Sequence, residues 1–184
     1  KPEMGKIVVT GATGGVGSMA VAILAKAGYE VIASTGKKEA QEYLKRLGAT
    51  DIVDRTEVDD ESGRPLLRPK WAGAIDTVGG NTLATLLKAC GRNGSVATCG
   101  LVASPKLPTS VFPFILNGVN LLGVDSAETP RDIRLDIWDR LATDWSINEH
   151  LDVATTDATL EELKDVYLDM ILAGKTKGRV VVSL

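Results

Sequence analysis

The sequence predicts an α/β fold in which a parallel sheet of six strands, in the order 3-2-1-4-5-6, is covered by helices on both faces. Short apolar runs alternate with segments of helical periodicity along most of the chain, which is typical of a doubly wound parallel sheet. A glycine-rich loop joins the first apolar run to the first helical segment. The strand order follows because crossover connections between parallel strands are right-handed.

The predicted elements follow one another at regular intervals. Strands are expected at residues 6–10, 29–33, 50–53, 73–76, 95–98 and 119–124. Helices are expected between them and after the last, because apolar side chains recur there every three or four residues, at 16–27, 39–47, 81–91, 111–117 and 130–144. The charged stretch at residues 54–70 contains a glycine and two prolines, so we interpret it as a surface excursion.

The end of the chain departs from this alternation. Thr159 and Glu162 have the spacing of a capping box, which opens a helix that stops at Gly174. A strand at residues 179–184 follows, and an unpaired terminal strand would be an aggregation-prone edge. We therefore expect this strand to belong to a sheet in a further domain, and we divide the chain into residues 1–145 and a C-terminal segment at 146–184.

Composition and charge exclude several classes of protein. Hydrophobic residues make up 44% and charged residues 24%, which indicates a globular and not a disordered chain. The net charge of −3 leaves no basic excess for nucleic acid, and the apolar runs are too short to span a bilayer. Cys90, Cys99 and His150 match no zinc motif, so we expect no metal. Two cysteines form no disulfide framework, which favours a reducing compartment such as the cytoplasm.

The loop at residues 11–17 is the first candidate site. Residues 15–20 read Gly-Val-Gly-Ser-Met-Ala, which fits the pattern G-x-G-x-x-A between a strand and a helix. Glycines let the backbone approach a diphosphate, and the helix dipole favours an anion at this end. The pattern therefore predicts a dinucleotide-binding domain of the Rossmann type. The diphosphate is expected to bind the amides of Val16, Gly17, Ser18 and Met19.

The second predicted strand ends without the acidic residue that NAD-binding sites place there. A hydroxyl, a bare backbone and cations suit a 2′-phosphate, which a carboxylate would repel. Arg55, just after the third strand, adds a planar guanidinium on the same side. These residues favour NADP(H) over NAD(H) as the coenzyme, and the expected contacts at the strand end are Thr35, Gly36, Lys37 and Lys38.

Ligands of such sheets bind beyond the carboxyl ends of the strands. This rule selects residues 77–79, 99–101 and 125–126, where glycines would let the backbone approach a nicotinamide ring. Cys99 lies in this set, but the sequence places no base to activate it as a nucleophile, so we predict a small buried thiol. No catalytic residue is predicted.

Four separated stretches, at residues 9–21, 35–49, 71–80 and 107–126, resemble in order the medium-chain dehydrogenase/reductases. The most similar branch is the zinc-free quinone oxidoreductase group that includes NADPH-dependent acryloyl-coenzyme A reductase. The resemblance implies a domain that supplies hydride from NADPH to an activated double bond or a quinone. It also implies a homodimer joined through the sixth strand. Contacts to the nicotinamide half are implied for Leu101, Ile115 and Ser126.

The resemblance covers only part of the family's pattern. Family members carry an N-terminal GroES-like β domain that forms the substrate pocket, and this sequence has none of it. The family's last strand returns to that domain, which accounts for the strand expected at residues 179–184. The opening Lys1-Pro2-Glu3-Met4 fits a tagged start or a segment excised from a longer chain. We therefore expect coenzyme binding here, with weak or no turnover by this chain alone.

Three other functions are compatible with parts of this sequence. Short-chain reductases share a similar glycine loop, but they need a Tyr-x-x-x-Lys pair, and no tyrosine here has a lysine four places on. An enoyl-reductase module of a polyketide or fatty-acid synthase stays open, because it shares the coenzyme and the hydride chemistry. A nucleotide-sensing module without a reaction of its own also stays open.

Overall fold

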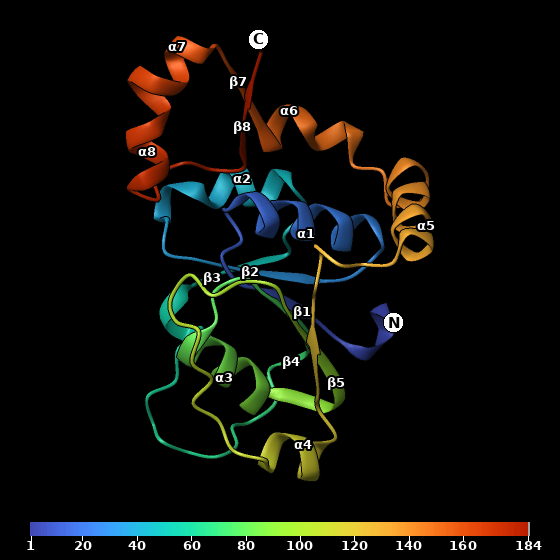
Figure 1. Cartoon of the computed structure of the whole chain (residues 1–184). Coiled ribbons are helices and arrows are strands. Elements are labelled where there is room, and N and C mark those ends of the chain that lie inside the picture. Colours follow the sequence, from blue (N-terminus) through green and yellow to red (C-terminus); the bar gives the residue numbers. More distant parts are fainter. Residues whose placement is uncertain (184) are drawn as a thin grey trace.

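Six parallel strands form the main sheet of the computed structural model, which describes residues 1–183 (Figure 1). Their order, β3-β2-β1-β4-β5-β6, confirms the predicted topology. The strands are β1 (Ile7–Val9), β2 (Val31–Thr35), β3 (Asp51–Asp54), β4 (Trp71–Asp76), β5 (Cys90–Thr98) and β6 (Asn120–Gly123).

Helices lie on both faces of this sheet (Figure 1). On one side are α1 (Gly15–Lys26) and α2 (Gln41–Arg46), and on the other are α3 (Gly80–Lys88) and α4 (Phe112–Asn117). Neighbouring side chains of β1 point to opposite faces of the sheet. Val8 belongs to the same apolar cluster as Leu86 of α3, whereas Val9 belongs to the same cluster as Val21 of α1. Short 3-10 turns occur at η1 (Pro2–Met4), η2 (Lys38–Ala40) and η3 (Arg55–Val58).

Strands β4 and β5 begin earlier than the sequence predicts. Trp71 pairs with Cys90, and an irregularity in register separates this pair from Gly73 and Ser95. The start of β5 contains two glycines, and Asn93 has a left-handed φ of 57°, so the stretch has the composition of a turn. Pairing with β4 nevertheless makes it a strand.

The C-terminal segment forms a second, smaller sheet. Strand β7 (Thr155–Ala158) pairs in parallel with β8 (Arg179–Val182), so the last strand has a partner within the chain. The sequence of β7, Thr-Thr-Asp-Ala, has no apolar alternation that would predict a strand. Leu184, the predicted end of the last strand, lies outside the described residues.

The helices from α5 onward are largely exposed. Helix α5 (Arg131–Ala142) buries no residue, and its predicted apolar face is open, with Trp138 62% exposed. The predicted capping box is confirmed, since Thr159 Oγ1 accepts from the Glu162 amide at 3.2 Å and Glu162 Oε2 accepts from the Thr159 amide at 2.8 Å. Of the helices in residues 1–183, none has the length and apolarity to cross a membrane. The remaining elements are η4 (Asn148–His150), α6 (Leu151–Ala154), α7 (Leu160–Glu162), the π-helical η5 (Leu163–Tyr167) and α8 (Leu168–Leu172).

Candidate functional site

The glycine-rich loop between β1 and α1 folds tightly back on itself. The Gly14 amide donates to the carbonyl of Gly11 at 2.9 Å, and Gly11 has a left-handed φ of 57°. A Cβ atom at Gly17 would overlap the Gly11 carbonyl oxygen and would lie 2.8 Å from Ala12 Cα. The motif therefore needs glycine at position 17 because the start of the helix packs directly on the loop backbone.

The first turn of α1 presents three free amides. Within residues 1–183, the N–H groups of Gly15, Val16 and Gly17 have no hydrogen-bond acceptor. They lie at the positive end of the helix dipole, where no acidic side chain occupies the first turn. An anion can therefore bind at this helix end.

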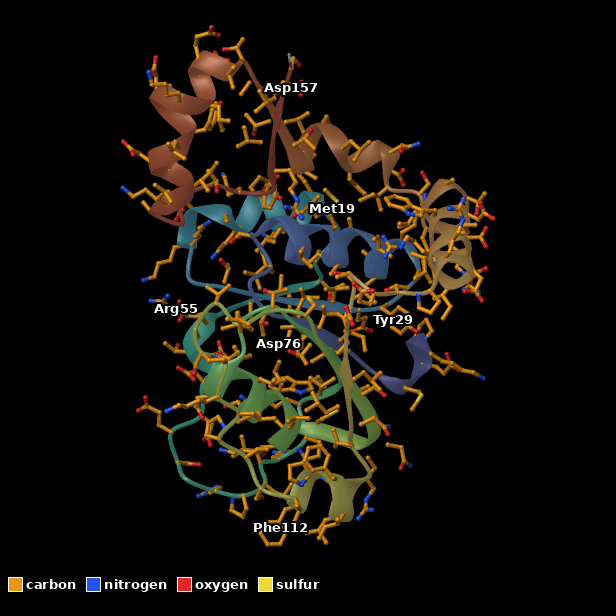
Figure 2. The ribbon with its side chains drawn as sticks, in the orientation of Figure 1. Met19, Tyr29, Arg55, Asp76, Phe112 and Asp157 are labelled. Atoms are coloured by element: carbon orange, nitrogen blue, oxygen red, sulfur yellow. The ribbon has the colours of Figure 1, made fainter. Side chains whose placement is uncertain are left out.

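Ser18 and Met19, two of the predicted diphosphate contacts, make contacts within the protein instead. The Ser18 amide donates to the Gly14 carbonyl at 2.9 Å, so the free donors start one residue earlier than predicted. Its buried hydroxyl donates to the same carbonyl at 2.8 Å. The side chain of Met19 is half-buried on the side of α1 that faces the C-terminal segment (Figure 2), where it packs against the apolar cluster that includes Ala154. The side chain of Val16 is exposed.

The carboxyl ends of β2 and β3 bring together the predicted cation group. Thr35 Oγ1 lies 3.3 Å from Thr13 Oγ1 and accepts from the Lys37 amide at 3.1 Å. Arg55 extends over Gly36, where a Cβ atom would be 3.0 Å from the arginine Cδ (Figure 2). Lys38 is exposed beside them. The hydroxyl, the bare backbone and the cations predicted from the sequence are therefore neighbours.

Lys37 is the half-buried member of this group. Its Nζ donates to the backbone carbonyl of Thr176, far along the chain. Burial lowers the pKa of the Lys37 ammonium group, and the charge of Lys177 lowers it further, while Glu39 acts in the opposite direction. The ammonium group consequently loses its charge at a lower pH than that of an ordinary surface lysine.

A buried carboxylate joins the ends of three strands. Asp76, the last residue of β4, is fully buried and accepts from Thr10 Oγ1 at 2.8 Å and from Thr98 Oγ1 at 3.2 Å. It also accepts from the amides of Val78 and Gly79 at 3.2 and 2.9 Å. This network fixes the turn after β4 relative to the glycine-rich loop, and Asp76 lies centrally in the molecule (Figure 2). No motif in the sequence marks Asp76 as part of the site.

An open cavity of about 410 Å³ lies at the ends of β5 and β6. Leu101, 63% exposed, lines it as predicted for this edge of the sheet, and Ser126 directly follows its last lining residue. Ile115 lies on α4, across the sheet from α1, and does not line this cavity (Figure 1). The full lining consists of Thr98, Cys99, Gly100, Leu101, Gly123, Val124 and Asp125.

The two cysteines are free thiols in different surroundings. Cys99 is exposed in the cavity at the ends of β5 and β6, so the prediction of a buried thiol at this position was wrong. The residue follows the last residue of β5, where the chain leaves the sheet. Partial burial of its sulfur and the Asp76 carboxylate both raise the Cys99 pKa. Cys90 is buried, and that burial raises its pKa to about 11.

Comparison with known proteins identifies the family. The family model described as zinc-binding dehydrogenase matches residues 15–143, which is more than half of the chain. The chain belongs to this family. The match agrees with the resemblance to the zinc-free branch of the medium-chain dehydrogenase/reductases. Within residues 1–183, the histidines, cysteines and acidic residues form no group of three that could hold a metal ion.

Three relatives resemble the chain along its whole length. AcuI of Ruegeria pomeroyi, an acrylyl-CoA reductase, is 48% identical, and YhfP of Bacillus subtilis, named as a quinone oxidoreductase, is 45% identical. The structure of YhfP with NAD bound gives a TM-score of 0.93. The YhdH oxidoreductase of Salmonella enterica in complex with NADP gives 0.94 at 46% identity. All of this chain is covered, but only 55–56% of each relative, so the chain spans about half their length.

Proposed function

We propose that the chain is the NADP(H)-binding domain of an oxidoreductase that transfers hydride to an activated carbon–carbon double bond or a quinone. The observation that carries this proposal is the free first turn of α1, whose three unpaired amides lie at the same sheet edge as a cation group. The names of AcuI and YhfP support the choice of acceptor class. Bound coenzyme would supply the hydride, and this chain's residues would bind and orient it.

The diphosphate would bind at the N-terminus of α1. The amides of Gly15, Val16 and Gly17 are free to donate to it, and the helix dipole adds to their attraction. Ser18 and Met19 are the other two predicted contacts. The Ser18 hydroxyl donates to the Gly14 carbonyl, and the Met19 side chain packs against the apolar cluster around α1, so both would support the turn. This binding would be common to NADPH and NADH, since both carry the diphosphate.

The 2′-phosphate would bind at the ends of β2 and β3. The Thr35 hydroxyl and the bare backbone of Gly36 leave room for it, and three cations would neutralise its charge: Lys37, Lys38 and Arg55. One solved relative holds NAD and another holds NADP, so the preference for NADPH rests on these side chains.

The nicotinamide would lie toward the cavity at the ends of β5 and β6. Gly100 lines this cavity and packs so closely on Thr77 that a Cβ atom would overlap the threonine backbone. A side chain at this position would therefore not fit. We assign Leu101 and Ser126 to this half on their positions, and Ile115 on the family resemblance alone. We also propose the cytoplasm as the compartment, because both thiols are free.

Parallel calorimetric titrations with NADPH and NADH test the coenzyme assignment. The native chain is expected to bind NADPH more tightly. In Lys37→Ala, the ratio of NADPH to NADH affinity should fall by about 10- to 150-fold, because one charge-assisted hydrogen bond is lost. Lys45→Ala, an exposed change at the end of α2, is the control and should leave the ratio unchanged. Equal affinities of the native chain for both coenzymes would contradict the assignment.

The acceptor requires a longer polypeptide. A chain extended by the N-terminal domain that the family resemblance implies should oxidise NADPH in the presence of acrylyl-coenzyme A or a quinone. Turnover with longer enoyl thioesters only would favour an enoyl-reductase module. NADPH binding without turnover on any acceptor would favour a sensing module.

A further inference from the structure

The segment at residues 176–178, here called the C-terminal strap, lies directly on the glycine-rich loop and passes beside α2 (Figure 1). The Gly178 amide donates to the Thr13 carbonyl at 2.9 Å. Gly178 has a left-handed φ of 61°, and a Cβ atom there would overlap the Ala154 carbonyl and lie 2.9 Å from the Tyr43 hydroxyl oxygen. The strap is therefore seated closely between the loop, α2 and the end of α6, and it has a defined position.

The strap holds the charged end of Lys37. Lys37 Nζ donates to the Thr176 carbonyl, so this side chain connects the end of β2 to the strap. Lys38 and Arg55, the other two cations proposed for the 2′-phosphate, are exposed, and within residues 1–183 their charged groups make no hydrogen bond or ion pair. Of the three cations in the part of the chain that is described, Lys37 is therefore the one whose charged group is held in place.

The acceptor on the strap is neutral. A main-chain carbonyl takes one of the three N–H donors of an ammonium group and leaves the other two, together with the charge, for a second acceptor. Within residues 1–183, no carboxylate lies within 4.0 Å of Lys37 Nζ. The contact with Thr176 therefore orders the Lys37 side chain without neutralising it.

An ordered lysine is a better phosphate ligand than a mobile one, because a mobile side chain loses rotamer freedom when it binds. We propose that the Thr176 carbonyl positions Lys37 for the 2′-phosphate, so that the strap contributes to the preference for NADPH over NADH. The proposal deepens the coenzyme assignment made above and rests on it. Thr176 and Gly178 are positioning residues in this account, because they act through Lys37.

Gly178→Ala tests this role, because the added methyl group has to displace the strap. The ratio of NADPH to NADH affinity, measured by calorimetric titration, should fall by about 2- to 13-fold, the loss expected when one long side chain must be ordered on binding. The ratio is measured because Arg179, the next residue, lies beside Gly15, and a shift of its position would affect both coenzymes alike. Gly174→Ala is the matched control. Gly174 has a similar φ of 65° but no atom within 4 Å of its Cβ position, so the ratio should stay unchanged.

The same substitution in a Lys37→Ala background separates positioning from a general loosening of the fold. With the ammonium group removed, Gly178→Ala should change the ratio no further, because the strap acts through that group. A second fall of the same size in this background would overturn the proposal. A ratio that Gly178→Ala alone leaves unchanged would also overturn it, and a raised ratio would mean that the strap competes with the phosphate for Lys37.

A measurement on the native chain covers the case in which Gly178→Ala does not fold. The carbonyl-carbon resonance of Thr176 should move during titration with adenosine 2′-monophosphate and saturate together with the amide resonance of Lys37. A Thr176 resonance that is unmoved at saturation would contradict the positioning role alone. Equal affinities of the native chain for NADPH and NADH would instead refute the 2′-phosphate assignment, and the positioning role with it.

Discussion

Lys37 shows how the position of one side chain sets its charge. It follows β2 closely enough for its amide to hydrogen-bond Thr35, yet its ammonium group reaches the Thr176 carbonyl. Burial by this distant segment lowers its pKa, which no local pattern could predict. The sequence therefore identifies Lys37 as a candidate ligand of the 2′-phosphate but gives no indication of how it titrates.

This shift predicts that coenzyme selectivity depends on pH. Lys37 is cationic below its pKa and neutral above it, and that pKa lies below the usual lysine value of 10.5. The preference for NADPH over NADH should therefore be stable near pH 7.5 and decline as the pH rises toward 10. Dissociation constants measured for both coenzymes across this range check the prediction.

Lys37→Arg provides the matched comparison, because a guanidinium keeps its charge over the whole range. Its selectivity should decline less steeply than that of the native chain. The same decline in both proteins would show that another group is responsible.

At the scale of elements, the junction of β1 and α1 depends on backbone packing. Gly17 touches the backbone of Gly11 and Ala12, so an added methyl group would have to displace the loop. Gly17→Ala should therefore lower the free energy of unfolding by about 1–3 kcal/mol, as overpacking does elsewhere, and should weaken coenzyme binding. Urea denaturation measures the first effect.

Gly123→Ala is the control for that substitution. A Cβ atom there has no neighbour within 4 Å, and the residue does not need a left-handed backbone. Its free energy of unfolding should stay within about 0.5 kcal/mol of the native value. Equal destabilisation by the two changes would remove the packing argument for Gly17.

The elements that local sequence patterns define were predictable, and the contacts between distant parts of the chain were not. The six strands and their order were predictable because buried parallel strands are short apolar runs between helical segments. The position of Arg55 beside Gly36 was predictable because adjacent strands end at one edge. The pairing of β7 with β8, and the contact of Arg179 with Gly15, depend on residues far apart in sequence and have no local signature.

At the scale of the whole molecule, β6 is an edge strand with an exposed apolar side chain, Leu122, 50% exposed. We propose that two copies join through this edge, as the family resemblance implies. Leu122→Lys should then shift the chain from dimer to monomer in sedimentation equilibrium, because like charges would meet at the joined edge. Leu172→Lys, an exposed change on α8, should leave the mass unchanged. A native chain that is monomeric at all concentrations would contradict the dimer.

The site as a whole draws on both ends of the chain. Asp76 ties the glycine-rich loop to β4 and β5, while Thr176 and Gly178, near the C-terminus, make hydrogen bonds to Lys37 and Thr13. Asp76 was not predictable as a functional position, because its importance lies in hydrogen bonds from two other strand ends, at Thr10 and Thr98, together with two from its own turn. Local sequence motifs therefore locate the candidate coenzyme site, and tertiary contacts determine its charge and rigidity.

Amide chemical shifts of the nitrogen-15-labelled chain, recorded during titration with NADPH, test the central claim most directly. The claim is that the first turn of α1 binds the diphosphate through its free amides. The account predicts that the amide resonances of Gly15, Val16 and Gly17 move strongly and saturate together with those of Lys37 and Lys38. Saturable binding that leaves the three α1 amides unmoved would contradict it.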